Sequence, residues 1–166
     1  MPAFDIIAFD ADDTLWHNER MYAAAEEKFV QLLSKYCERG SISARLFETE
    51  MRNMTSLGYG AKAFTLSMIE TAIQLSGGKI SAAEIGQVMQ NGKDILNAEV
   101  DLFPHVRETI PLLAAKHPLM LITKGDLLDQ ESKLSRSGLA DCFRHVEIIS
   151  DKNANSYRRI FERYEI

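Results

Sequence analysis

An acidic cluster follows the first apolar run of the sequence and contains Asp10, Asp12 and Asp13. Carboxylates this close repel one another, so they favour a bound cation. A carboxylate at the end of a strand can also attack a phosphorus centre and form an acyl-phosphate. A second carboxylate two residues on, on the same side of an extended backbone, can pass a proton to the leaving oxygen. Solvated Asp-rich turns are also common, so the cluster alone leaves both interpretations open.

Two further polar residues follow later apolar runs. Thr123, with the backbone amide of Lys124, could cradle an anion at the start of a helix, or Thr123 could be an ordinary helix N-cap. Lys152 could neutralise a phosphate and an attacking carboxylate, or it could be a solvated surface lysine. Taken together, the acidic cluster, Thr123 and Lys152 favour a catalytic site over ordinary surface residues. Each group comes at the carboxyl end of its own predicted strand, the edge where open α/β sheets bind ligands.

The elements that would position these residues form a strand, a long helical stretch, and then alternating helices and strands. The apolar runs at 4–9, 119–122 and 146–149 predict buried strands of a parallel sheet. Apolar spacing and end signals predict helices at 19–39 (ended by Gly40), 61–76, from the capping box Ser81/Glu84 onward, within 105–116, at 127–137 and at about 154–164. The stretch from about 17 to 100 is far too long for an ordinary crossover and indicates an inserted helical module.

Composition narrows the class of protein. The chain has 166 residues, 46% of them hydrophobic, and a formal net charge of −5. These values are typical of a globular domain, and the acidic balance argues against a nucleic-acid binder. No apolar run approaches the roughly 18 residues of a membrane span. The cysteines, Cys37 and Cys142, form no close pair, which disfavours a disulfide framework or structural zinc. We expect a cytoplasmic protein that binds neither nucleic acid nor membrane.

The constellation resembles the haloacid dehalogenase (HAD) superfamily. Its first motif, an apolar strand followed by Asp-x-Asp-x-Thr, matches Asp10 to Thr14, its second matches Thr123 and its third matches Lys152. The phrase from Thr123 to Asp126, followed by Gln130, Lys133, Ser137-Gly138-Leu139 and Phe143, is similar to HAD hydrolases that carry a helical cap after strand one. The resemblance implies an α/β fold: a Rossmann-like, HAD-like parallel-sheet core at 1–16 and 101–166, with an all-helical cap at 17–100.

The resemblance also implies roles for individual residues. Asp10 would be the nucleophile and a Mg²⁺ ligand, and Asp12 the general acid/base, with its backbone carbonyl also on the metal. Thr123 and the Lys124 amide would hold the phosphoryl group, and Lys152 would bridge Asp10 and the phosphate. The family's dehalogenases generally lack the second Asp. Asp12 therefore favours a magnesium-dependent phosphatase acting on a small phosphorylated metabolite, with a phosphomutase as the alternative.

Two departures from the family pattern bear on activity. Asp13 stands where glycine is usual, and the sequence ends at Ile166, before the fourth motif that completes the family's magnesium site. The core would then be incomplete and would hold magnesium weakly, unless Asp126 or Asp151 substitutes as a ligand. The first strand would have an open edge, which favours a homodimer or aggregation. A truncated, non-catalytic HAD-like chain, or a piece of a longer one, is the competing hypothesis.

Overall fold

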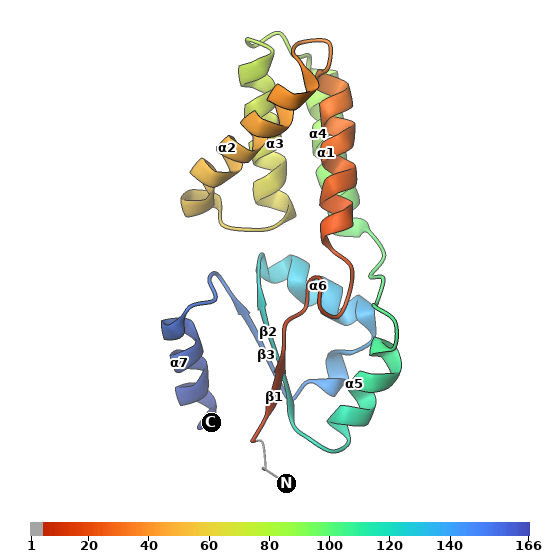
Figure 1. The fold of residues 1–166 in the computed structure, drawn as a ribbon, viewed down its shortest axis with the longest axis vertical. Helices are drawn as coiled ribbons and strands as arrows, with labels where there is room; N and C mark the ends of the chain where they lie inside the picture. Colours follow the sequence, from red (N-terminus) through yellow and green to blue (C-terminus); the bar gives the residue numbers. More distant parts are fainter. Residues whose placement is uncertain (1–4) are drawn as a thin grey trace. The chain divides into compact units, whose positions relative to one another are not determined.

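The structure is a computed structural model that describes residues 5–166, and the chain divides into two compact units. One is an α/β unit, Met1–Asn18 with Glu99–Ile166, and the other is a helical unit, Glu19–Ala98. The sequence predicts these boundaries at 16/17 and 100/101. The elements are β1 (Ile7–Phe9), α1 (Glu19–Leu33), α2 (Arg39–Leu57), α3 (Ala61–Leu75), α4 (Ala82–Asn97), α5 (Val106–Ala114), β2 (Leu119–Lys124), α6 (Leu127–Ser137), the 3₁₀ turn η1 (Ala140–Cys142), β3 (His145–Ile149) and α7 (Ala154–Tyr164) (Figure 1).

The α/β unit is built on a parallel sheet with the order β1-β2-β3 among the described residues. Leu119 and Leu121 of β2 pack with residues of α5 and α6, whereas Met120 and Ile122 pack with Ile160 of α7. Successive side chains of a strand point to opposite faces, so helices cover both faces of β2. This arrangement explains why the sequence of β2 is a continuous apolar run, and it confirms the predicted parallel α/β core.

The outer strand β1 differs from its prediction. The run at 4–9 predicts a buried strand, but the strand has three residues, of which Ala8 is exposed and Ile7 and Phe9 are half-buried. Phe4, where the predicted strand begins, lies outside the described residues. Within the described part of the chain β1 pairs only with β2, at one edge of the sheet. An edge strand is covered less than a central one, so apolar sequence alone overestimates its burial.

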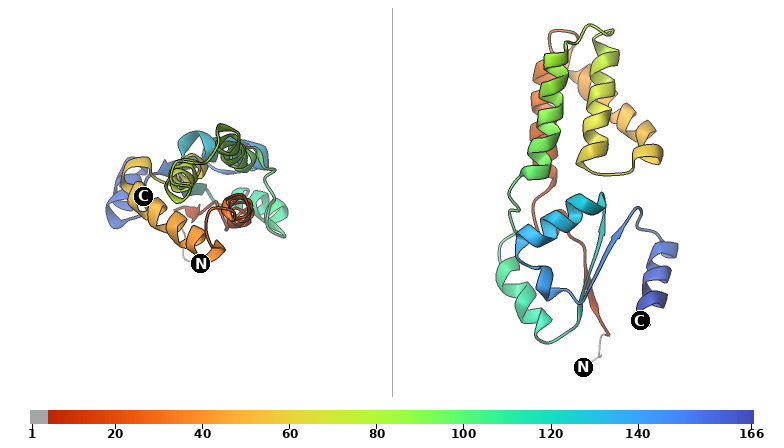
Figure 2. Two further views of the ribbon diagram at one scale, coloured as in Figure 1. Left: turned by 90° about the horizontal axis from the view of Figure 1, so that it is seen from above. Right: turned by 180° about the vertical axis from the view of Figure 1, so that it is seen from behind.

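The helical unit has its own apolar core, to which all four of its helices contribute, including Phe29, Ile42, Met68 and Val88. Helices α1 and α4 lie side by side (Figure 2), and an ion pair joins Lys28 to Asp94 at 3.7 Å. No helix among the described residues has the length and apolar character needed to cross a membrane.

The first helix of this unit is shorter than predicted, and helix α2 was not predicted at all. The sequence predicts one helix at 19–39 that Gly40 ends, but α1 stops at Leu33 and Gly40 lies in the first turn of α2. The amides of Tyr36 and Cys37 both bond to the carbonyl of Leu33, so a tight turn separates the helices. Gly40, which was predicted to end a helix, therefore lies in the first turn of the next one.

The start of α4 is as predicted. The side chain of Ser81 accepts from the amide of Glu84, and Glu84 accepts from the amide of Ser81, which completes the capping box. Lys35 lies 2.8 Å from the Glu84 carboxylate, and mainly this contact lowers the pKa of Glu84 to about 2.

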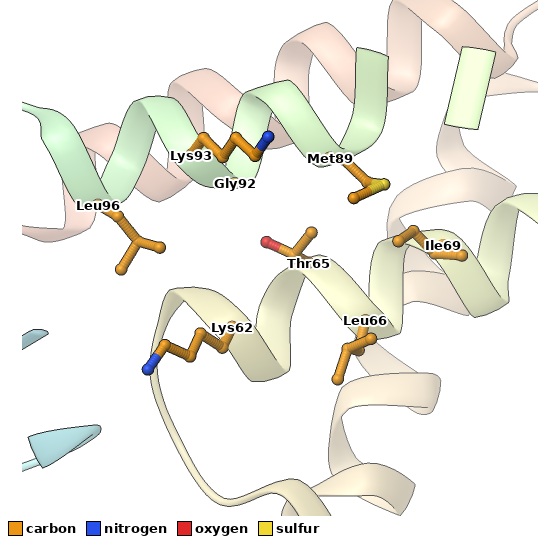
Figure 3. Close-up of a pocket in the computed structure, with 8 residues that line it drawn as sticks. All are labelled: Lys62, Thr65, Leu66, Ile69, Met89, Gly92, Lys93 and Leu96. Carbon is orange, nitrogen blue, oxygen red and sulfur yellow. The ribbon is translucent and has the colours of Figure 1, made fainter. Parts of the chain in front are cut away.

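Helices α3 and α4 approach closely at Gly92, beside a groove of about 290 Å³ (Figure 3). The groove is lined by apolar side chains, including Leu66, Met89 and Leu96, together with Lys62 and Lys93. A Cβ atom on Gly92 would lie 1.9 Å from Oγ1 of Thr65. The two helices can therefore pack at this distance only because residue 92 has no side chain.

Candidate active site at the carboxyl ends of the strands

The structure places the motif residues at one edge of the sheet. Asp10 directly follows β1, Thr123 and Lys124 are the last two residues of β2, and Lys152 comes three residues after β3. Phe9 pairs with Leu121, and Thr123 pairs with Ile148. In a parallel sheet this register brings all three strand ends to the same side.

Asp10 and Lys152 are in direct contact, although 142 residues separate them in the sequence. The Nζ atom of Lys152 donates to Oδ1 of Asp10. Both groups remain partly exposed, the lysine side chain at 24% and the aspartate at 43%. A lysine in this position offsets negative charge at the carboxylate while leaving it accessible.

The loop after Asp10 is a tight turn. The amides of Thr14 and Leu15 both bond to the carbonyl of Ala11, and the amide of Asp13 bonds to that of Trp16 at 2.8 Å. The turn puts Asp13 in the left-handed region, at φ 55°. Glycine adopts this conformation without strain, and aspartate is among the few other residues that adopt it readily. The Asp13 carboxylate accepts from the amide of Asn18 at 2.9 Å and so helps to close the loop.

The carboxylate of Asp12 faces α6 and accepts from three side chains, two of them on that helix and one in the loop after β1. Nε1 of Trp16 lies 2.7 Å from Oδ1, and Nε2 of Gln130 lies 2.7 Å from Oδ2. Nζ of Lys133 lies 3.1 Å from Oδ1 and 3.2 Å from Oδ2. The Asp12 side chain is 21% exposed, so it is held firmly without being sealed from solvent.

Thr123 is buried, and its hydroxyl donates to Oε1 of Gln130 at 3.2 Å. It does not cap α6. The N-cap of that helix is Asp126, whose carboxylate accepts from the amide of Asp129 at 3.1 Å. The structure therefore brings Asp12 and Thr123 together through one shared partner, Gln130. In this arrangement the Thr123 hydroxyl is already committed, so binding an anion requires it to leave Gln130.

Lys133 is almost completely buried, at 3% exposure, and is surrounded by acceptors. Besides Asp12, its Nζ contacts Oδ1 of Asn18 at 2.8 Å and Oδ2 of Asp129 at 3.2 Å. Burial raises the pKa of Asp129 above its usual value, although Lys133 acts in the opposite direction. The direct contact with the ammonium group of Lys133 offsets part of this effect of burial.

The oxygen groups at the edge of the sheet fit magnesium in kind but not in number. Among residues 5–166 no group of three or more His, Cys, Asp or Glu side chains is placed to hold a metal ion. The remaining donors are the Asp10 carboxylate and the main-chain oxygen of Asp12. The carboxylate of Asp126 caps a helix, and that of Asp151 accepts from Asn153. Magnesium commonly keeps several waters and is held by one or two carboxylates with substrate phosphate, so these donors suit a weak site.

No contact with Asp12 was predicted from the sequence for Gln130 or Lys133. Gln130 and Lys133 entered only as part of the phrase that resembles HAD hydrolases. Their spacing of three residues puts them on one face of α6, which was the available signal. Nothing in the sequence indicated that this face is turned toward Asp12.

Comparison with known proteins identifies the family of this chain. A family model described as haloacid dehalogenase-like hydrolase matches residues 4–165. A crystal structure of a haloacid dehalogenase-like family hydrolase from Xanthomonas campestris is 40% identical, with a TM-score of 0.93; the match covers 99% of this chain and 69% of that one. None of the curated proteins matches the sequence.

Two more distant structures share the fold. A 2-haloacid dehalogenase from Pseudomonas syringae is 19% identical with a TM-score of 0.64, and the match covers 99% of this chain and 74% of that one. A predicted phosphoglycolate phosphatase from Haemophilus somnus is 16% identical with a TM-score of 0.59, covering 98% and 72%. At these identities the likeness concerns the fold alone. The family model and the Xanthomonas structure show that this chain belongs to the haloacid dehalogenase-like hydrolases.

Proposed function

We propose that this chain is a magnesium-dependent phosphatase that hydrolyses a small phosphomonoester through an aspartyl-phosphate on Asp10. The observation that carries the proposal is the second carboxylate, Asp12, held by Trp16, Gln130 and Lys133 beside the predicted nucleophile. An alkoxide leaving group needs a proton, whereas a halide leaves without one. A held acid/base at this position therefore supports phosphoryl transfer over carbon–halogen cleavage.

The proposed reaction has two steps. A carboxylate oxygen of Asp10 attacks phosphorus, the bond from phosphorus to the ester oxygen breaks, and Asp12 gives that oxygen its proton. Asp12 then takes a proton from water, the water oxygen attacks the aspartyl-phosphate, and inorganic phosphate leaves with the Asp10 carboxylate restored. Lys152 offsets charge at Asp10 in both steps, while Thr123 and the Lys124 amide orient the phosphoryl oxygens. Magnesium bound at Asp10 and the Asp12 carbonyl would supply further charge neutralisation.

The proposal also covers the role of the helical unit and the compartment in which the protein works. We assign the helical unit the role of a cap that excludes water and selects the substrate. The thiols of Cys37 and Cys142 are free, which suits a protein working in the cytoplasm. A phosphomutase would share the first step, with a sugar hydroxyl in place of water as the acceptor.

The test is a screen of phosphorylated metabolites and p-nitrophenyl phosphate, with magnesium and with a chelator. Asp10→Asn should abolish turnover while circular dichroism stays unchanged. Asp141→Asn, the same change at an exposed position of the α/β unit, should retain full activity. Persisting hydrolysis in Asp10→Asn would remove the mechanism. A folded wild-type chain that cleaves no phosphate ester would favour the non-catalytic alternative, and size-exclusion chromatography would then show whether it forms a homodimer.

A further inference from the structure

We propose that Gln130 and Lys133 of α6 are positioning residues that hold the Asp12 carboxylate for its acid/base work and connect it to Thr123. This inference rests on the proposed function, since it concerns how Asp12 performs a step of that reaction. Neither residue touches the reacting atoms in this scheme, so both act through Asp12.

The hydrogen-bond chemistry fixes which group each partner serves. An indole N–H and an ammonium group can only donate, so Trp16 and Lys133 must direct their protons at Asp12. With Gln130 they make four contacts to two carboxylate oxygens, which together offer about four lone-pair positions. These contacts hold the carboxylate in one orientation, and proton transfer at Asp12 requires one of them to open.

The burial of these partners is costly and is not needed for the core. Gln130 and Lys133 are each 3% exposed, on a helix face that an apolar side chain would fill at lower cost. The ammonium group of Lys133 has three protons, and the structure surrounds it with three acceptor residues, Asp12, Asn18 and Asp129. A buried lysine with all its donors used defines its own position and, through it, that of Asp12.

Gln130 ties the first motif to the second. Its amide nitrogen donates to Asp12 while its amide oxygen accepts from Thr123, so the two contacts together determine the orientation of the amide. Gly125 leaves the space for this side chain, because a Cβ atom there would lie 3.1 Å from Nε2 of Gln130. If the Thr123 hydroxyl turns from Gln130 to a bound phosphate, the Gln130 amide loses one of the two contacts that orient it toward Asp12.

A positioning role predicts an effect that depends on the leaving group. Protonation by Asp12 matters when the leaving group is an alkoxide, and matters little for p-nitrophenolate, which is a stable anion. In a two-step hydrolysis kcat/KM reports the step in which the leaving group departs. It therefore isolates the acid role of Asp12 from its later role as base.

The experiment compares kcat/KM for β-glycerol phosphate and p-nitrophenyl phosphate in the full chain with magnesium. Lys133→Met and Gln130→Leu should each lower kcat/KM for β-glycerol phosphate by about 10- to 100-fold, part of the general-acid contribution. For p-nitrophenyl phosphate the loss should not exceed about threefold, because little protonation is required. Glu131→Gln, at an exposed position of the same helix, should leave both values unchanged. Gln130→Leu keeps the test open if Lys133→Met fails to fold.

Equal losses for the two esters would indicate a structural role and overturn the proposal, as would no loss for either. The sequence has one tryptophan, so the indole N–H resonance of Trp16 reports the Asp12 contacts without any substrate. That resonance should move in Lys133→Met and stay in place in Glu131→Gln, and an unmoved resonance in Lys133→Met would refute the arrangement. A wild-type chain that cleaves neither ester would remove the proposed function and the positioning role with it. The resonance would then show whether the contacts exist apart from that function.

Discussion

Two glycines of helix α4 should respond oppositely to the same substitution. Gly86 has no atom within 4 Å of where a Cβ would lie, whereas at Gly92 that position is 1.9 Å from Oγ1 and 2.9 Å from Cβ of Thr65. Alanine in a helix interior is favoured over glycine by about 1 kcal/mol, so Gly86→Ala should stabilise the chain by about that amount.

At Gly92 the same gain is outweighed by overpacking. Forcing extra atoms into a packed contact costs about 1–3 kcal/mol, and the upper end applies because three Thr65 atoms lie within 3 Å. Thr65 cannot simply turn away, since its hydroxyl donates to the carbonyl of Ala61 at 2.6 Å, a bond worth about 1 kcal/mol. After the gain in helix propensity, Gly92→Ala should destabilise the chain by about 2 kcal/mol, roughly 3 kcal/mol below Gly86→Ala.

Urea unfolding followed by far-UV circular dichroism measures this difference as a shift in midpoint at constant slope. Adding Thr65→Ala to Gly92→Ala should restore about 1–2 kcal/mol, because it removes Oγ1 and Cγ2 from the contact and the two residues are coupled. If Gly92→Ala is as stabilising as Gly86→Ala, helices α3 and α4 do not approach as the structure shows, and the reasoning fails.

Three further predictions concern single residues. Burial, with a smaller contribution from Glu26, raises the pKa of Glu50 to about 7, so the folded chain binds this proton more tightly than the unfolded chain. The ionised Glu50 side chain therefore destabilises the folded chain increasingly as the pH rises from about 4.5 to 7. Glu50→Gln should be more stable than wild type by about 1–2 kcal/mol at pH 8 but not at pH 4, as measured by urea midpoints. Asp13→Ala should be about 1 kcal/mol less stable than Asp13→Gly in the same assay, because only glycine adopts the left-handed region freely. Lys152→Met should lower turnover of p-nitrophenyl phosphate by about 10²–10³-fold, as expected for loss of a preorganised charge, and an unchanged rate would separate Lys152 from the reaction.

The positions of the site residues could be predicted from the sequence mainly because these residues follow the ends of strands. Asp10 and Lys152 lie far apart in the chain, but each follows an apolar run, and parallel strands bring such positions together. The same logic placed Thr123 correctly while leaving its hydroxyl partner open. A prediction of this kind depends on backbone geometry, which repeats from one parallel sheet to the next.

The features that were missed depend on side-chain environment. In α2 the buried face includes Thr49, and the large apolar residues Phe47 and Met51 are exposed, so the usual apolar stripe is absent. Glu38 precedes the helix without a side-chain cap, which removes the other signal of a helix start. The contacts of Lys133 were equally hidden, because the rotation of α6 about its axis is set by packing on the sheet and not by its own sequence.

Helices α1 and α4 run alongside each other, with Lys28 near Asp94. Lys35 near the end of α1 meets Glu84 near the start of α4. The polypeptide thus leaves the β1 side at Asn18 and returns at Glu99 from the same end of the helical bundle. The pairing of β1 with β2 closes a loop that contains the whole helical bundle. Each doubling of the length of such a loop costs only about 0.6 kcal/mol of chain entropy. Replacing the bundle by a shorter or longer one should therefore leave the strand pairing intact, so that the bundle can be exchanged between relatives as a cassette.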